Sequence, residues 1–450
     1  MKKTKGFWTF RYTLINILYF VAFCTIHAYA GVFLLDKGFT NTQVGLALAI
    51  ANILSVFGQP LTAGIIDKGG VLTNRLVVMF SSLFLLLGSV MLIFVKSAQV
   101  PIFIVFVLMY TVQFVYQPIM IAMNFEYAKA GCKINFGLAR GMGSAGFAVT
   151  SFFLGKAVAD YGTGVILYVT IIAMAVMVLV VFLFKKPSGS GKEERILKSD
   201  IPSKDDLSEI SAKETGNSKE SEIIQKDISE KDREADLKSS TASSKAGDDA
   251  ANNFFAFVKR YPFFVVFLLG SACCFFAHNM INDFMIQIIN SLGGDEAQLG
   301  YATFLQAILE LPVMALIGFV LKKISERYML IFSAVSFFVK TAILIFATAM
   351  LGMYVSQSFQ MFAYAVFIPT AAYFADNVMK EKDKVKGQAY INCAITLGGV
   401  FSNLASGKLL DTFGVKPMLA VGSAVCLIGV FVTVIAVIPM YKSAAKKQPV

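Results

Sequence analysis

Long apolar segments alternate with short polar ones along nearly the whole chain of 450 residues. A helix that crosses a bilayer needs about 20 mainly apolar residues. Twelve segments fit that length, six on each side of a polar stretch, so the pattern predicts an all-α integral membrane protein. The predicted spans are residues 12–35, 43–66, 76–95, 101–128, 136–158, 165–184, 262–289, 299–321, 328–349, 352–377, 387–410 and 417–440.

The polar stretch, residues 185–261, differs in composition from everything around it. It carries 15 Lys and Arg against 16 Asp and Glu, and few large apolar side chains. Such a segment cannot bury enough apolar surface to offset the entropy lost on ordering. We therefore expect a disordered cytoplasmic linker between two six-helix bundles, residues 1–184 and residues 262–450.

The two halves are related in sequence at an offset of about 250 residues. Gly137 matches Gly387, and each glycine follows an acid by about 11 residues, Glu126 in one half and Asp376 in the other. Further matches are Gly155 with Gly407, Asp160 with Asp411 and His27 with His278. Two tandem bundles with a site between them at mid-depth are the layout of an alternating-access transporter.

Composition agrees with a membrane protein and argues against other classes. The chain is 56% hydrophobic and 15% charged, which is typical of a protein whose main solvent is lipid. Its net charge of +11 comes from short basic segments between spans, so no nucleic-acid partner is expected. The six cysteines lack metal-ligand spacing, and no nucleophile–base motif or phosphate loop is present. We expect no enzyme, no metal and no cofactor.

Basic residues gather at one end of the predicted spans. The loops containing Lys68, Lys129, Lys322 and Lys380 lie on this side, together with both termini. Short cytoplasmic loops are rich in Lys and Arg. Both termini are therefore placed in the cytoplasm, and the protein in the inner (cytoplasmic) membrane as a multi-pass protein.

The segment between the second and third spans carries a recognisable motif. Residues 58–61 read Gly-Gln-Pro-Leu and are followed by Gly64 and Asp67. This resembles the signature loop of the major facilitator superfamily. Phe7-Trp8 and the run from Asn135 to Gly137 resemble the lactose permease group of oligosaccharide:proton symporters. The resemblance covers the chain except the linker, and it implies two pseudo-symmetric six-helix bundles, the major facilitator fold.

Charged groups within spans are functional candidates, because an ionisable side chain in a bilayer is costly unless paired or facing water. Arg140 matches the arginine with which the lactose permease binds its sugar, and Phe147 stands where that family stacks an aromatic ring. The resemblance implies that both contact substrate. Glu126 lies nearer the cytoplasm and is assigned with Asp67 and Asp376 to the gates.

Glu310 is the deepest carboxylate, about half-way along the eighth span. Lys340 stands in the ninth span, where the resembled family has an arginine. Two interpretations are open for this pair: Glu310 carries a coupling proton near Lys340, or the two form a structural ion pair. Asp283, in the outward part of the seventh span, is a further candidate for proton coupling.

Several uncharged polar side chains are predicted to bind substrate. His27 and His278 are the only two histidines and occupy equivalent points of the repeat, in spans that line the cavity of this fold. A histidine packed between helices without a ligand explains each of them equally well. Asn279 follows His278, and Gln357 and Gln360 replace titratable residues of the resembled family, so that family's usual proton route is missing.

We therefore expect a secondary active transporter that moves a polar small molecule, such as a sugar or glycoside, by proton-coupled symport. The expected partners are this substrate, a proton or other cation, and the bilayer, with the monomer as the working unit. Two alternatives remain: an efflux antiporter for drugs or metabolites on the same fold, and a membrane sensor that does not transport.

The linker assignment can be tested by deletion. Replacing residues 192–249 with a short Gly/Ser connector should leave transport intact, because the segment lacks a core and joins bundles that meet in the membrane. The measurement is uptake per amount of protein in the membrane. Loss of transport at normal membrane levels would contradict the assignment.

Overall fold

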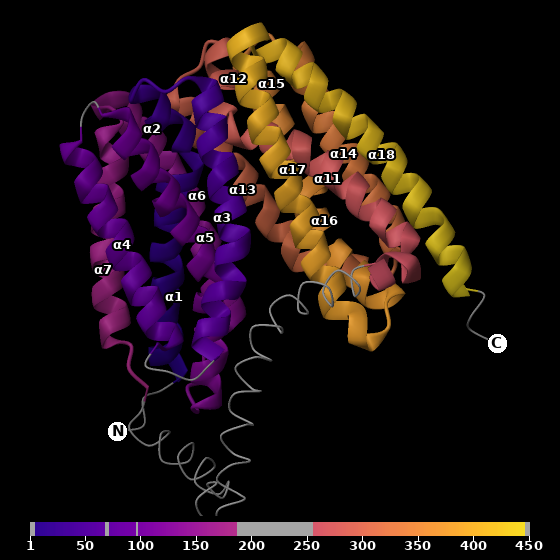
Figure 1. Ribbon diagram of the computed structural model, residues 1–450, viewed down its shortest axis with the longest axis horizontal. Coiled ribbons are helices and arrows are strands. Elements are labelled where there is room, and N and C mark those ends of the chain that lie inside the picture. The colour runs from indigo at the N-terminus through magenta and orange to yellow at the C-terminus, as the bar shows by residue number, and fades with distance from the viewer. Residues whose placement is uncertain (1–4, 68–71, 96–97, 187–254, 446–450) are drawn as a thin grey trace, which may run out of the picture. The chain divides into compact units, whose positions relative to one another are not determined.

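The computed structural model describes residues 5–67, 72–95, 98–186 and 255–445. These residues form helices and turns, with no strand among them. Twelve helices are long and apolar enough to cross a membrane, which confirms the predicted fold class (Figure 1). The chain divides into a large unit, Met1–Lys185 with Val266–Val450, and a small one, Lys186–Val265. Most of the predicted linker lies outside the described residues, and the bounds of the three predicted segments stay a prediction.

Six spans form each half of the large unit, and within each half the long helices run side by side in Figure 1. The N-terminal half comprises α1 (Lys5–Phe23), the π-helix η1 (Cys24–Ala28), α2 (Ala30–Asp36), α3 (Asn41–Asp67), α4 (Asn74–Phe94), α5 (Gln99–Lys129), α6 (Phe136–Tyr161) and α7 (Gly164–Leu183). The C-terminal half comprises α11 (Pro262–Asp283), α12 (Met285–Ser291), α13 (Glu296–Val320), α14 (Glu326–Phe346), α15 (Met350–Ser358), α16 (Gln360–Val378), the 3-10 helix η2 (Glu381–Asp383), α17 (Lys384–Phe413) and α18 (Val415–Ala445).

Three spans are interrupted where the sequence predicts continuous helices. The first breaks at Tyr29, the seventh at Phe284 and the tenth at Phe359. At Tyr29 and Phe284 the backbone leaves the helical region, with φ of −104° and −115°. The prediction was wrong here because no proline or glycine marks these points. Both aromatic side chains are fully buried, so each of these two breaks lies inside the bundle.

Two side-chain hydrogen bonds show the repeat in space. Asn74 at the start of α4 donates to Glu126 near the end of α5, at 2.9 Å. In the C-terminal half, Asn377 near the end of α16 donates to Glu326 at the start of α14, at 2.5 Å. The amide and the carboxylate exchange places, yet equivalent helices are tied at equivalent ends. The two halves therefore share their architecture as well as their sequence pattern.

The halves meet along two helix pairs, α6 against α13 and α3 against α17. With twelve spans, α1 begins and α18 ends on the same side, and we name the opposite side the far end. There, a Cβ atom on Gly155 of α6 would lie 2.4 Å from the Glu296 carbonyl oxygen, and one on Gly45 of α3 would lie 2.1 Å from the Asn403 carbonyl oxygen. Glycine is required at both places because it lets the two backbones touch.

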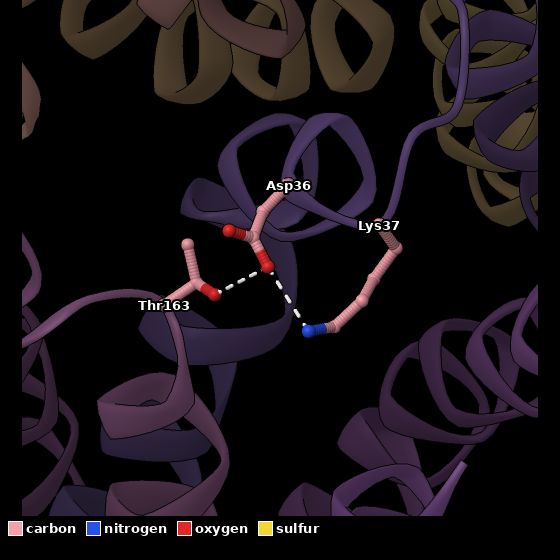
Figure 2. Close-up of polar contacts among 3 residues, drawn as sticks. All are labelled: Asp36, Lys37 and Thr163. Carbon is pink, nitrogen blue, oxygen red and sulfur yellow. Dashed lines mark hydrogen bonds and ion pairs between the residues drawn. The ribbon is translucent and has the colours of Figure 1, made fainter. Parts of the chain in front are cut away.

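A polar contact fixes the far end of the N-terminal half (Figure 2). Thr163 Oγ1 donates to Asp36 Oδ2 at 2.7 Å, and Lys37 Nζ donates to the same oxygen at 3.0 Å. Partial burial acts to raise the pKa of Asp36, but the bonds from Thr163 and Lys37 outweigh it, so the pKa is lowered from its ordinary value. The ionised carboxylate thus ties the end of α2 to the turn before α7.

Asp36→Asn should lower thermal stability at neutral pH by less than about 1 kcal/mol, because the contact is partly exposed and screened. Folding lowers this pKa, so the contribution is present above the unfolded pKa, near 4, and is lost as the pH falls through the folded value. The melting temperatures of the purified wild type and the variant should therefore converge below about pH 4. A difference that stays constant down to about pH 3 would contradict this role.

Candidate functional site

Three polar side chains in the C-terminal half form a hydrogen-bonded chain with an amide in the middle. Lys340 of α14 donates Nζ to Gln360 Oε1 at 2.6 Å, and Gln360 Nε2 donates to Glu310 Oε1 at 2.9 Å. Lys340 is fully buried and Gln360 is 2% exposed. Among the described residues no direct ion pair joins Lys340 to Glu310. Both residues named from the sequence are thus brought together, with Gln360 between them.

Local backbone structure places these groups. Gln360 opens α16 directly after the break at Phe359, where backbone bonds of the i to i+3 type replace the α-helical ones. Ser356 Oγ, on the α15 side of this break, donates to the Lys340 carbonyl oxygen at 2.8 Å and so ties α15 to α14. Gln357 is fully buried, and its Oε1 has no partner among the described residues. A buried acceptor without a partner can serve a ligand.

His278 packs against Tyr364, a residue that the sequence reasoning missed. The two rings stack at 5.3 Å between centroids, and Asn282 Nδ2 donates to His278 Nε2 at 2.9 Å. Tyr364 also lies within electrostatic range of Glu310 and of Arg140 in the other half. Its position four residues after Gln360, one turn along the same helix face, was the signal available in the sequence.

Arg140 of α6 lies over an aromatic ring, but that ring is Phe20 of α1. The guanidinium carbon is 4.3 Å from the Phe20 ring centroid, and Nη1 donates to Ser144 Oγ at 3.1 Å. Phe147 packs instead against Phe23, at 6.1 Å between centroids. No carboxylate pairs with Arg140 in the part of the chain that the structure describes. The cation is therefore held by a ring face and a hydroxyl, and its binding of substrate stays a prediction.

His27 stands in the π-helix η1, inside an aromatic cluster. Its ring stacks on Phe23 at 4.2 Å and lies 3.8 Å from the ring of Tyr110 and 4.4 Å from that of Phe114. Neither ring nitrogen has a hydrogen-bond partner among the described residues, and both atoms are buried. Short π-helical turns occur frequently at functional sites. His27 thus offers one donor and one acceptor, which the fold itself leaves unused.

Asn279 and Asp283 of α11 have neighbours other than Lys340, Gln360 and Glu310. Asn279 faces α17, where its Nδ2 would be 2.8 Å from a Cβ atom on Gly399. Asp283 is the last residue of α11 and lies within electrostatic range of Tyr110 in the N-terminal half. The structure thus places Asp283 in a different environment from Glu310, and its assignment to proton coupling stays a prediction.

The residues predicted as gates lie at the opposite side from the far end. Asp376 forms an ion pair with Lys384 at 3.1 Å, within the C-terminal half. Glu126 accepts the bond from Asn74 within the N-terminal half. Asp67 is the last residue of α3, and its side chain is not among those described. These contacts of Glu126 and Asp376 tie helices within a half, and the gate assignment stays a prediction.

Comparison with known proteins identifies the family. The sequence profile of the MFS_1 like family, in which MFS denotes the major facilitator superfamily, matches residues 9–421. The chain belongs to the MFS_1 like family. This confirms the superfamily resemblance seen in the motifs, whereas a search of curated proteins by sequence finds no match.

Solved structures share the fold of this MFS protein at low sequence identity. A point mutant of the nucleoside transporter NupG has a TM-score of 0.70 and 14% identity, over 97% of this chain and 99% of that one. The peptide transporter POT in complex with sulfate has a TM-score of 0.65 and 10% identity, over 98% and 95% of the two chains. These likenesses confirm the fold, and both neighbours are transporters, not enzymes.

Arg140→Lys should abolish ligand binding, because an ammonium cannot reproduce the planar fork of donors over Phe20. The measurement is the thermal shift produced by a ligand found in a screen of sugars, glycosides and nucleosides. Arg11→Lys is the matched control, since the Arg11 guanidinium also lies over a phenylalanine ring, Phe7, at 4.4 Å, and donates to a backbone carbonyl. An unchanged thermal shift in Arg140→Lys would remove Arg140 from the site.

Proposed function

We propose that this MFS protein is a secondary active transporter that moves a polar small molecule across the cytoplasmic membrane together with a proton, by symport. The observation that carries the proposal is the chain Lys340–Gln360–Glu310, in which a buried cation and a carboxylate share one amide. A permanent structural ion pair does not need an amide between its two charged groups. A carboxylate that changes its charge during a transport cycle benefits from such an amide.

Gln360 links the charge of Glu310 to that of Lys340. While Glu310 is ionised, it accepts from the Gln360 amide, and the Gln360 carbonyl accepts from Lys340, so each group is paired. Protonation of Glu310 removes the only negative charge in this chain of three residues and leaves a buried cation facing a neutral amide, which is costly in a bilayer. The three groups must then rearrange, and that dependence on protonation is what coupling requires.

The substrate proposed is a ring compound with several hydroxyl groups, such as a sugar, a glycoside or a nucleoside. Four hydrogen-bonding groups support it: the donors of Arg140, the free Oε1 of Gln357, the two ring nitrogens of His27 and the hydroxyl of Tyr364. The rings of Phe20 and Phe23 pack against Arg140 and His27 and add apolar surface beside these groups. Pockets of this composition bind amphipathic rings.

The two halves both contribute to this constellation, since Arg140 and His27 belong to one half and Gln357 and Tyr364 to the other. A ligand held by both halves binds more tightly in one arrangement of the halves than in another. Such a differential affinity is the condition for binding to drive a conformational change.

Glu310→Gln, which mimics the protonated acid, should abolish accumulation of substrate against its gradient but leave exchange of labelled for unlabelled substrate intact. Both are measured in proteoliposomes with an imposed proton gradient. Glu381→Gln is the control, because Glu381 is an exposed acid on η2 that pairs with Lys384. Accumulation against the gradient by the Glu310→Gln variant would show that Glu310 has a structural role. Accumulation by the wild type only under the reversed proton gradient would indicate efflux.

A further inference from the structure

Asp411, at the end of α17, binds the first turn of α3 in the other half. Its Oδ1 accepts from the Asn41 backbone nitrogen at 3.1 Å and from Asn41 Nδ2 at 2.8 Å. Its Oδ2 accepts from the Thr42 backbone nitrogen at 2.7 Å and from Thr42 Oγ1 at 2.6 Å. One carboxylate thus receives four hydrogen bonds from the first two residues of a helix that belongs to the opposite bundle.

This contact completes a helix end that the local sequence caps only in part. Thr40 Oγ1 accepts from the Gln43 backbone nitrogen, and Gln43 Oε1 accepts from that of Thr40, which is a local capping box. The N–H groups of Asn41 and Thr42 point out of the helix and have no carbonyl partner within it. Asp411 supplies their acceptor, and its negative charge lies at the positive end of the α3 dipole.

Other hydrogen bonds between the halves also lie at the far end. Gln287 of α12 donates to Asn41 Oδ1 at 2.9 Å, and Ser151 of α6 donates to the Gly300 carbonyl oxygen of α13 at 3.0 Å. Asp411 adds a charged side chain to these bonds across the halves. Its equivalent in the repeat, Asp160, is exposed and makes no such bond in the described part of the chain.

We propose that Asp411 is a latch that holds the far end of this transporter closed, and that opening of the far end requires release of the α3 N-terminus from this carboxylate. The contact is suited to repeated opening because Asp411 and Thr42 are exposed at the end of the bundle. Water can replace each broken bond there, whereas a charge freed within the bilayer would stay unsolvated. The proposal needs the alternation implied by the proposed transport function, but neither its substrate nor its coupling ion.

The latch can be tested by the exposure of a reporter thiol in the other helix pair. Ser151 is fully buried between α6 and α13 and does not touch Asp411, so Ser151→Cys in a background with the native cysteines replaced by serine reports whether the far end opens. A membrane-impermeant maleimide is added to intact cells, since the far end is predicted to face outward. Asp411→Ala should speed labelling about tenfold, and Asp411→Asn less, because the amide keeps an acceptor but loses the charge.

Asp160→Ala is the matched control and should leave the labelling rate unchanged. Equal rates for Asp411→Ala and Asp160→Ala would overturn the proposal. If Asp411→Ala elutes as misfolded protein on size exclusion, Thr42→Val provides the test, because it removes one of the four bonds. A smaller increase in the labelling rate is expected for this variant. An unchanged labelling rate in Thr42→Val would also overturn the proposal. The labelling assay measures exposure of the thiol and not uptake. Its result therefore does not depend on whether the Glu310→Gln assay supports proton coupling.

Discussion

The hydrogen bond from Lys340 to Gln360 is the contact on which the centre of this protein depends. An ammonium group in hydrocarbon has no water to bond, so α14 can carry Lys340 only where another helix brings an acceptor to it. Gln360 does so from the first residue of α16 and at the same time reaches Glu310 on α13. Three helices are therefore fixed relative to one another by a single amide, and the break at Phe359 lies directly before it.

The N-terminal half holds its cation within the bilayer in a different way. Arg140 has no acid beside it among the described residues and is held by the Phe20 ring and the Ser144 hydroxyl. One half thus contains an internally compensated pair, and the other a cation whose charge is not compensated by a described neighbour. Tyr364, within electrostatic range of both Arg140 and Glu310, is where the two arrangements meet. The hydroxylated ring compound proposed as the substrate would supply acceptors to this cation.

The sequence predicts the spans well because lipid thickness sets their length and excludes charge, so most of them begin and end within a few residues of expectation. It does not predict the breaks at Tyr29, Phe284 and Phe359, since no proline or glycine stands at these residues. Glu310 and Lys340 stand out as charges in apolar runs. The position of Gln360 between these two residues cannot be predicted from the sequence, because it depends on how three helices are rotated about their axes. Phe20 and Tyr364 were missed among 42 Phe and 16 Tyr.

The glycine contacts between the halves have a mechanical consequence. Helices usually pack with the side-chain ridges of one in the grooves of the other, and such surfaces must disengage many side chains before they separate. At Gly155 and Gly45 the backbones touch directly, and no side chain from either glycine enters a groove of the partner helix. Each pair of helices can therefore tilt about its contact point without a change of rotamer at these two positions. Resistance to tilting then comes from the side chains around each contact point, such as the Phe152 ring of α6 against Tyr301 and Phe304 of α13, and from the polar bonds between the halves.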